Sequence, residues 1–166
     1  MPAPALVDPS QAWSLLSPEP ESRIDTTRWS THAQRFFAFS LNVVPAKLYP
    51  NNATPICDNA QVNLRRASSG DSHTVEIVTA PVERAAAVMA RARDAVTVIG
   101  GAGFDALLPR TRRVWQVRAM PETNPAAALA LAAVLASVYL APIVAPGKLD
   151  IFGVKGARER LARAGW

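Results

Sequence analysis

The chain of 166 residues contains very few of the side chains that build disulfide frameworks or metal centres. It has one cysteine, Cys57, and two histidines. A single cysteine excludes an internal disulfide, and there is no CxxC pair or cluster of cysteine and histidine to predict a zinc site. We therefore expect neither a metal nor a cofactor, and the low cysteine content fits a reducing compartment.

The chain also lacks the signals of export and of membrane insertion. Its N-terminus has no basic segment followed by an apolar run, so it does not resemble a signal peptide, and we expect a cytoplasmic protein. The uncharged stretch 124–147 has the length of a membrane span. However, Pro142 limits its helical part to about 16 residues, alanine fills much of it, and no second hydrophobic segment follows. We expect no membrane partner.

The composition is that of one globular domain with an uneven charge. Hydrophobic residues make up 49% and charged residues 19%. The net charge is +5, with −3 in residues 1–27 and +8 in the remainder. A basic body attracts nucleic acid or an anionic ligand. Arginine supplies 15 of the 18 basic residues, which a GC-rich genome produces without selection, so a solvated basic surface is the simpler interpretation.

The first 27 residues are rich in proline, which predicts that no long helix or strand forms there. Trp13, Leu15 and Leu16 nevertheless form a small apolar cluster. We interpret residues 1–27 as a Pro-rich acidic tail, or as an arm that wraps a partner subunit with Trp13 as its anchor. Residues 28–166 are then a single globular domain.

The pattern of the body predicts an α+β or mixed α/β fold, with one sheet of four to six short strands. Alternating or continuous apolar residues indicate strands at 36–44, 61–66, 74–78, 96–99, 112–120 and 149–154. The second and third of these have the spacing of an antiparallel hairpin. Two main helices, 81–94 and 124–141, pack on the sheet, and a short basic helix follows at 155–164.

The Ala-rich helix Ala126–Ala141 is apolar on every face, so we expect it to be buried on nearly all sides. A small domain has little material to cover a whole helix. The sequence leaves two alternatives open, burial in the core of one chain and burial at the interface of an oligomer. Full burial within one chain would favour the glycine-rich segment that follows residue 99 as the functional site.

That segment reads Val98-Ile99-Gly100-Gly101-Ala102-Gly103-Phe104, a pattern typical of a strand that enters a glycine-rich turn. It resembles the GGAGF segment of extended short-chain dehydrogenases, which implies a dinucleotide-binding turn. The resemblance covers seven residues. It departs from that family at Pro109 and in the absence of a Tyr-xxx-Lys pair, and about 60 residues remain where several βα units are required. A plain glycine turn is the alternative.

Charged residues near this segment are the candidate functional groups. Gly100, Gly101 and Gly103 together with Arg110, Arg112 and Arg113 form a candidate site for phosphate or carboxylate. The candidate acids and bases are Asp105, Glu122 and His73. A triad built on Cys57 has no supporting local signature. Solvent exposure of the alternating arginines is the simpler interpretation.

Three functions follow from these patterns. The first is a non-catalytic binding or assembly protein, a homo-oligomer or a small subunit, whose contacts are the Ala126–Ala141 helix and the arm around Trp13. The alternative is a small enzyme or enzyme subunit acting on an anionic small molecule at the Gly100–Phe104 loop. The third is a basic protein associated with nucleic acid, without any recognisable nucleic-acid-binding motif.

Overall fold

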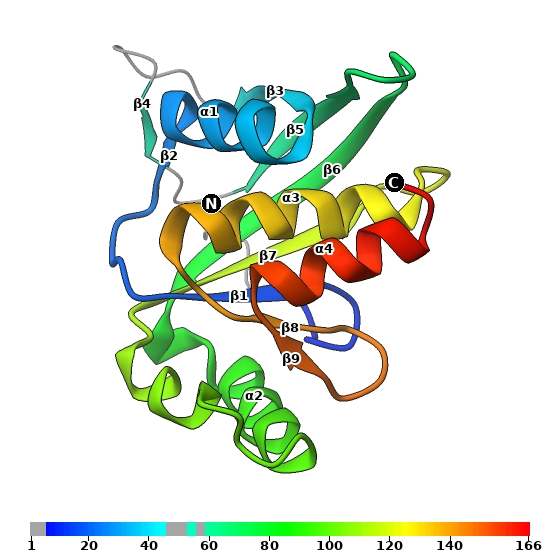
Figure 1. Cartoon of the computed structure of the whole chain (residues 1–166). Helices are drawn as coiled ribbons and strands as arrows, with labels where there is room; N and C mark the ends of the chain where they lie inside the picture. The colour runs from blue at the N-terminus through cyan, green and yellow to red at the C-terminus, as the bar shows by residue number, and fades with distance from the viewer. Residues whose placement is uncertain (1–5, 46–52, 56–58) are drawn as a thin grey trace.

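The computed structural model describes residues 6–45, 53–55 and 59–166, and it has an α+β architecture (Figure 1). One antiparallel sheet of seven strands has the order β3-β5-β6-β7-β1-β8-β9, and β2 and β4 form a separate pair. The large sheet consists of β1 (Trp13–Ser17), β3 (Phe39–Pro45), β5 (Asn59–Arg66), β6 (Ser72–Pro81), β7 (Arg113–Ala119), β8 (Ile143–Val144) and β9 (Ile151–Phe152). The small pair is β2 (Arg23–Asp25) and β4 (Ala53–Pro55). The antiparallel hairpin predicted from the strands at 61–66 and 74–78 is present as β5 and β6.

The sheet has more strands than the four to six predicted, partly because β1 lies in the Pro-rich segment for which the sequence indicates no strand. This strand pairs antiparallel with β7 on one side and with β8 on the other. Pro9 and Pro18 lie outside its ends, so neither removes a hydrogen-bond donor from the ladder. Leu15 enters the core on one face of the sheet and Leu16 the core on the other. The sequence predicts no long strand in this segment, and the structure places a short one of five residues there.

Helices cover the two faces of the sheet unequally (Figure 1). The helices α1 (Thr26–Phe37), α3 (Pro125–Tyr139) and α4 (Val154–Arg163) share one core with the sheet. In Figure 1, α3 crosses the sheet between α1 and α4. The helix α2 (Ala86–Val98) packs with Leu16, Val114 and Val144 in a second core on the opposite face.

Helix α3 begins and ends almost as the sequence predicts. Asn124 caps it by accepting a hydrogen bond from the backbone N–H of Ala126 at 3.0 Å, and Pro125 occupies the first helical position. Every residue from Ala126 to Tyr139 is buried except Ser137, which is partly exposed. The sheet and the two flanking helices bury it within its own chain. Within the described residues, no helix is long and apolar enough to cross a membrane.

Helix α2 begins and ends later than predicted, and its last turn replaces one predicted strand. A 3-10 turn at Val82–Arg84 precedes it, and the helix then continues through Val98. The strand predicted at Val96–Ile99 is therefore wrong. Ala92, Ala95 and Val96 are buried against the sheet at helical spacing, so tertiary packing overrides the strand preference of the β-branched residues.

Candidate functional site

The glycine-rich segment ends α2 instead of linking a strand to a helix. Positive φ angles occur at four consecutive residues, Gly100 (77°), Gly101 (86°), Ala102 (48°) and Gly103 (87°). Four backbone N–H groups of this segment donate to backbone carbonyls within residues 96–101. The donors are Gly100, Gly101, Ala102 and Phe104. Donors used in this way are not free to bind a phosphate. Because a helix precedes the glycines, the strand–turn–helix arrangement that the dehydrogenase resemblance implied is absent here.

The three arginines that follow have different surroundings. Arg113 is partly buried, where its Nε donates to the Pro20 carbonyl at 2.8 Å and its guanidinium also donates to Thr79 Oγ1 at 3.2 Å. These contacts tie β7 to the loop after β1 and to β6. Arg110 and Arg112 are exposed and stand on either side of Thr111 in the chain. Two of the three predicted arginines are thus surface groups beside Thr111.

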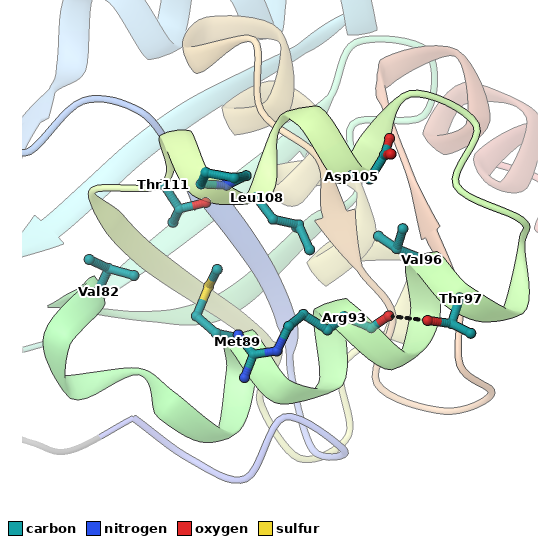
Figure 2. Close-up of a pocket in the computed structure, with 9 residues that line it drawn as sticks. Val82, Met89, Arg93, Val96, Thr97, Asp105, Leu108 and Thr111 are labelled. Carbon is teal, nitrogen blue, oxygen red and sulfur yellow. Dashed lines mark hydrogen bonds between the residues drawn. The ribbon is translucent and has the colours of Figure 1, made fainter.

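A pocket of about 700 Å³ lies between α2 and the two 3-10 turns at Phe104–Ala106 and Leu108–Arg110 (Figure 2). Its lining consists of Val82, Met89, Arg93, Val96, Thr97, Asp105, Leu108, Pro109 and Thr111. In Figure 2 the side chains of Met89, Val96 and Leu108 point toward the hollow. Met89 and Leu108 also pack against the core between α2 and the sheet. The volume falls in the range of pockets that hold small organic molecules.

Thr111 supplies a polar group to the wall of this pocket. The residue is 6% exposed, and its Oγ1 atom is buried without a hydrogen-bond partner among the described residues. Its backbone N–H, by contrast, donates to the Leu108 carbonyl at 3.2 Å. A buried hydroxyl left without a partner destabilises a fold by about 1–3 kcal/mol. Oγ1 has almost no exposed surface, so an occupant of the pocket would recover that loss only where the neighbouring side chains shift to admit its polar group.

Two charged side chains of the lining come from opposite walls. Arg93 extends from α2 and Asp105 from the turn at Phe104–Ala106, and both are exposed. Within the described part of the chain, the three ion pairs found involve neither of them. Thr97, also on α2, already donates its hydroxyl to the Arg93 carbonyl at 3.0 Å. Figure 2 shows the Arg93 side chain extending beside Met89.

The candidate acids and bases do not converge. Asp105 lies before the start of β7, whereas Glu122 lies after its end with a φ of 67°. Seven extended residues of β7 separate these positions by about 20 Å. His73, at the start of β6, packs against the Trp166 ring with 5.2 Å between ring centroids. Cys57 lies outside the described residues. Among those described, no group of three or more His, Cys, Asp or Glu side chains forms a metal site.

Sequence reasoning missed a polar pair between α1 and α3. His32 Nδ1 lies 2.8 Å from Ser137 Oγ. Burial, followed by the charges of Arg28 and Arg35, lowers the pKa of His32 and favours a neutral imidazole. A serine beside a neutral histidine has the chemistry of a nucleophile and its base. Neither described pocket includes this pair, so we interpret it as a contact between the helices.

A second cavity of about 410 Å³ lies beside the N-terminal end of α3. Trp13, Arg118 and Pro125 are among its lining residues. Its charged side chain, Arg118, is already paired with Glu76 at 3.0 Å. The larger pocket is the better candidate because it contains a polar atom without a partner.

Three arginines of the basic helix at the C-terminus already form hydrogen bonds or ion pairs within the chain. Arg158 donates to the Phe36 carbonyl, Arg160 forms an ion pair with Asp150, and Arg163 donates to the Glu159 carbonyl. The contacts of Arg158 and Arg160 join α4 to other parts of the chain, whereas the bond of Arg163 lies within α4. Cations engaged in this way are less available to the phosphates of a nucleic acid.

Comparison of the chain with known proteins finds no match to a protein family, to a curated protein or to a solved structure.

Proposed function

We propose that this protein binds a small amphipathic molecule in the pocket between α2 and residues 104–111. The observation that carries the proposal is the buried Thr111 hydroxyl, which has no partner among the described residues and lies on the wall of a pocket of about 700 Å³. Apolar pockets with a few polar groups are typical of sites for small organic ligands. The role that we propose is therefore the binding of such a ligand.

The lining indicates the chemistry of the ligand. Met89, Val96 and Leu108 offer contacts to an aliphatic or aromatic body. Thr111 offers one hydrogen bond, and Arg93 offers a positive charge to an acidic group. Arg110 and Arg112, exposed on either side of Thr111, add to the positive potential near this wall. The single carboxylate of Asp105 opposes these positive charges but is outnumbered by them, so a carboxylate attached to an apolar chain or ring fits this wall best.

The burial of α3 supports a ligand-binding role over assembly through that helix. Along Ala126–Tyr139, only Ser137 is not buried. Leu140, the residue after the end of the helix, is 83% exposed. Trp13 is partly buried against the main core, with its ring centroid 6.0 Å from that of Phe152. These surfaces offer little area to a partner, since specific interfaces bury about 800 Å² on each side.

Titration with three decyl compounds tests the proposal. We expect isothermal titration calorimetry to detect saturable binding of decanoate, weaker binding of decanol and the weakest binding of decylammonium, because Arg93 favours the anion. The variant Arg93→Gln should bind decanoate about two- to fivefold less tightly while its affinity for decanol stays the same, because Arg93 is exposed. Equal affinity for all three compounds, or no saturable binding of decanoate, would contradict the proposal.

The substitution Thr111→Val tests the hydroxyl directly. It removes a buried polar atom that lacks a partner and keeps the shape, so the unliganded protein should be equally stable or more stable in urea unfolding. Binding of decanoate should weaken by about 3–10-fold because a hydrogen bond is lost. The matched control is Thr97→Val in the same pocket, whose hydroxyl already bonds to the Arg93 carbonyl. If both variants bind like the wild type, Thr111 is not part of the site.

A further inference from the structure

Strand β3 is the outermost strand at one edge of the large sheet. Its seven residues pair with β5, and no other described strand pairs with it. The opposite edge is formed by β9, which has two residues. Short edge strands resist pairing with other chains, whereas long ones present a row of unpaired backbone groups. The two edges of this sheet therefore differ in their capacity to bind another strand.

Over residues 39–44, the edge of β3 also lacks the features that usually protect such strands. Residues 39–45 read FSLNVVP, and no charged side chain occurs among them. Lysine on the strand, a bulge or an inward-pointing charge are the usual devices that prevent edge pairing, and the only proline stands at the end of β3. Val44 on β3 and Phe36 at the end of α1 are 46% and 45% exposed. Exposed apolar groups thus accompany an uncharged edge.

The hydrogen-bonding pattern shows which residues face outward along this edge. The Ala67 N–H donates to the Ala38 carbonyl at 3.0 Å, directly beyond the register pair Phe39↔Arg66. Bonded and non-bonded pairs alternate along an antiparallel ladder. Ser40 and Asn42 therefore exchange bonds with β5, whereas the backbone groups of the alternate residues point away from the sheet. These outward-facing residues are Phe39, Leu41 and Val43.

We infer that the protein forms a dimer in which the β3 strands of two copies pair antiparallel about a two-fold axis at Leu41. In this register Phe39 of each copy faces Val43 of the other, and Leu41 faces Leu41. All three are residues whose backbone groups point outward, so each pair forms two hydrogen bonds. The side chains also match. Ser40 faces Asn42 on the open side of the sheet, which is the exposed side of β3 that points away from α1, and apolar residues face each other on the side of α1.

A second copy fits this edge better than a charged peptide would. Two molecules of net charge +5 repel each other, and contact through an uncharged strand keeps like charges out of the seam. The register is self-complementary, with polar opposite polar and apolar opposite apolar. Pairing would join two seven-stranded sheets into one continuous sheet. The dimer is independent of the proposed ligand pocket, since none of its lining residues belongs to β3.

Lysine substitution on the open side of β3 tests the dimer. Sedimentation velocity of the full chain from 1 to about 200 μM should show a concentration-dependent dimer. In the double variant Ser40→Lys/Asn42→Lys, two lysine pairs face each other across the seam, so the dimer dissociation constant should rise about tenfold or more. The control is Gln61→Lys/Ser72→Lys, which adds the same charge at exposed positions of the same sheet away from the seam. It should leave the dissociation constant within about threefold of the wild-type value.

A charge-swap experiment decides between edge pairing and a general loss of association. The variant Ser40→Glu/Asn42→Glu should also be monomeric on its own, because glutamates then face each other. Mixing it with the lysine variant should restore a heterodimer, since each seam pair becomes Lys opposite Glu. Circular dichroism and thermal unfolding show whether each variant is folded. A wild-type protein that stays monomeric, a lysine variant that dimerises like the control, or a mixture that fails to pair would each overturn the inference.

Discussion

Tyr139 is the side chain on which several core contacts of this domain meet. Its hydroxyl accepts a hydrogen bond from Trp29 Nε1 at 3.1 Å, and its ring stacks on Trp115 with 6.1 Å between centroids. The Arg28 guanidinium lies 5.4 Å from the ring centroid. Burial raises the pKa of Tyr139 to about 12, while the bond from Trp29 acts in the opposite direction. The phenol therefore stays protonated in the folded protein far above neutral pH.

This pKa predicts how stability changes at alkaline pH. The unfolded tyrosine has a pKa of about 10, so between pH 10 and about 12 the unfolded state loses a proton that the folded state keeps. The free energy of unfolding must fall as pH rises through that window. In Tyr139→Phe this dependence is lost. The variant should be about 1–3 kcal/mol less stable at pH 8, because the buried Trp29 N–H loses its acceptor.

Urea unfolding at pH 8 and pH 11 measures the effect. The stability difference between wild type and Tyr139→Phe should be smaller at pH 11 than at pH 8 by about 1 kcal/mol, because pH 11 lies one unit above the pKa of the unfolded tyrosine. The control Trp29→Phe removes the donor but keeps the phenol, so its stability should still fall with pH in parallel with the wild type. Parallel curves for wild type and Tyr139→Phe would contradict the prediction.

Among the elements, α3 ends on a residue that is poorly suited to its conformation. Leu140 has a φ of 52° and is 83% exposed. A left-handed conformation costs an L-residue about 1–2 kcal/mol, and glycine is the usual residue at such a helix end. Leu140→Gly should therefore raise the free energy of unfolding by about 0.5–1 kcal/mol, after allowing for the flexibility of glycine in the unfolded chain.

The control for this prediction is Leu140→Ala, which removes the exposed side chain but keeps Cβ. Thermal unfolding should place the alanine variant within about 0.5 kcal/mol of the wild type and the glycine variant above both. Equal stabilisation by both substitutions would show that the exposed side chain, and not the backbone conformation, is responsible.

Element by element, the sequence predicts those structures whose signals are local. The β5–β6 hairpin follows from alternation and a turn, and the start of α3 follows from Asn124 and Pro125. Strand β1 was missed because it is buried on both faces, so Leu15 and Leu16 are both apolar and the alternation is lost. The end of α2 was read as a strand because Val96–Ile99 is rich in β-branched residues.

At the scale of the whole molecule, the pocket shows why the site was only partly predicted. Asp105 was a candidate and lines the pocket, but the α2 residues Met89, Arg93 and Thr97 were not. Their spacing of four residues places them along one face of the helix, which is the signal that could have found them. That spacing identifies the wall of a pocket only when α2 is known to pack against residues 104–111. This packing depends on contacts between residues distant in sequence.

The position of β1 has a consequence for the whole fold. It is the first strand of the chain, yet it joins β7 to β8 in the middle of the sheet. Deleting residues 1–17 should therefore abolish cooperative thermal unfolding, because β8 and β9 lose their connection to the remaining strands and Trp115 loses its neighbour Leu15. A detachable arm would instead leave the transition unchanged.

Two point variants distinguish loss of the strand from loss of the terminus. Leu15→Ala truncates a side chain with no exposed surface and should destabilise the protein by about 2–5 kcal/mol in urea unfolding. Gln11→Ala, at an exposed position just before the strand, should change stability by no more than about 0.5 kcal/mol. If the deletion variant kept a cooperative transition near the wild-type temperature, the sheet could form without β1. Its central position would then be unnecessary for the fold, and residues 1–17 would act as a separate segment.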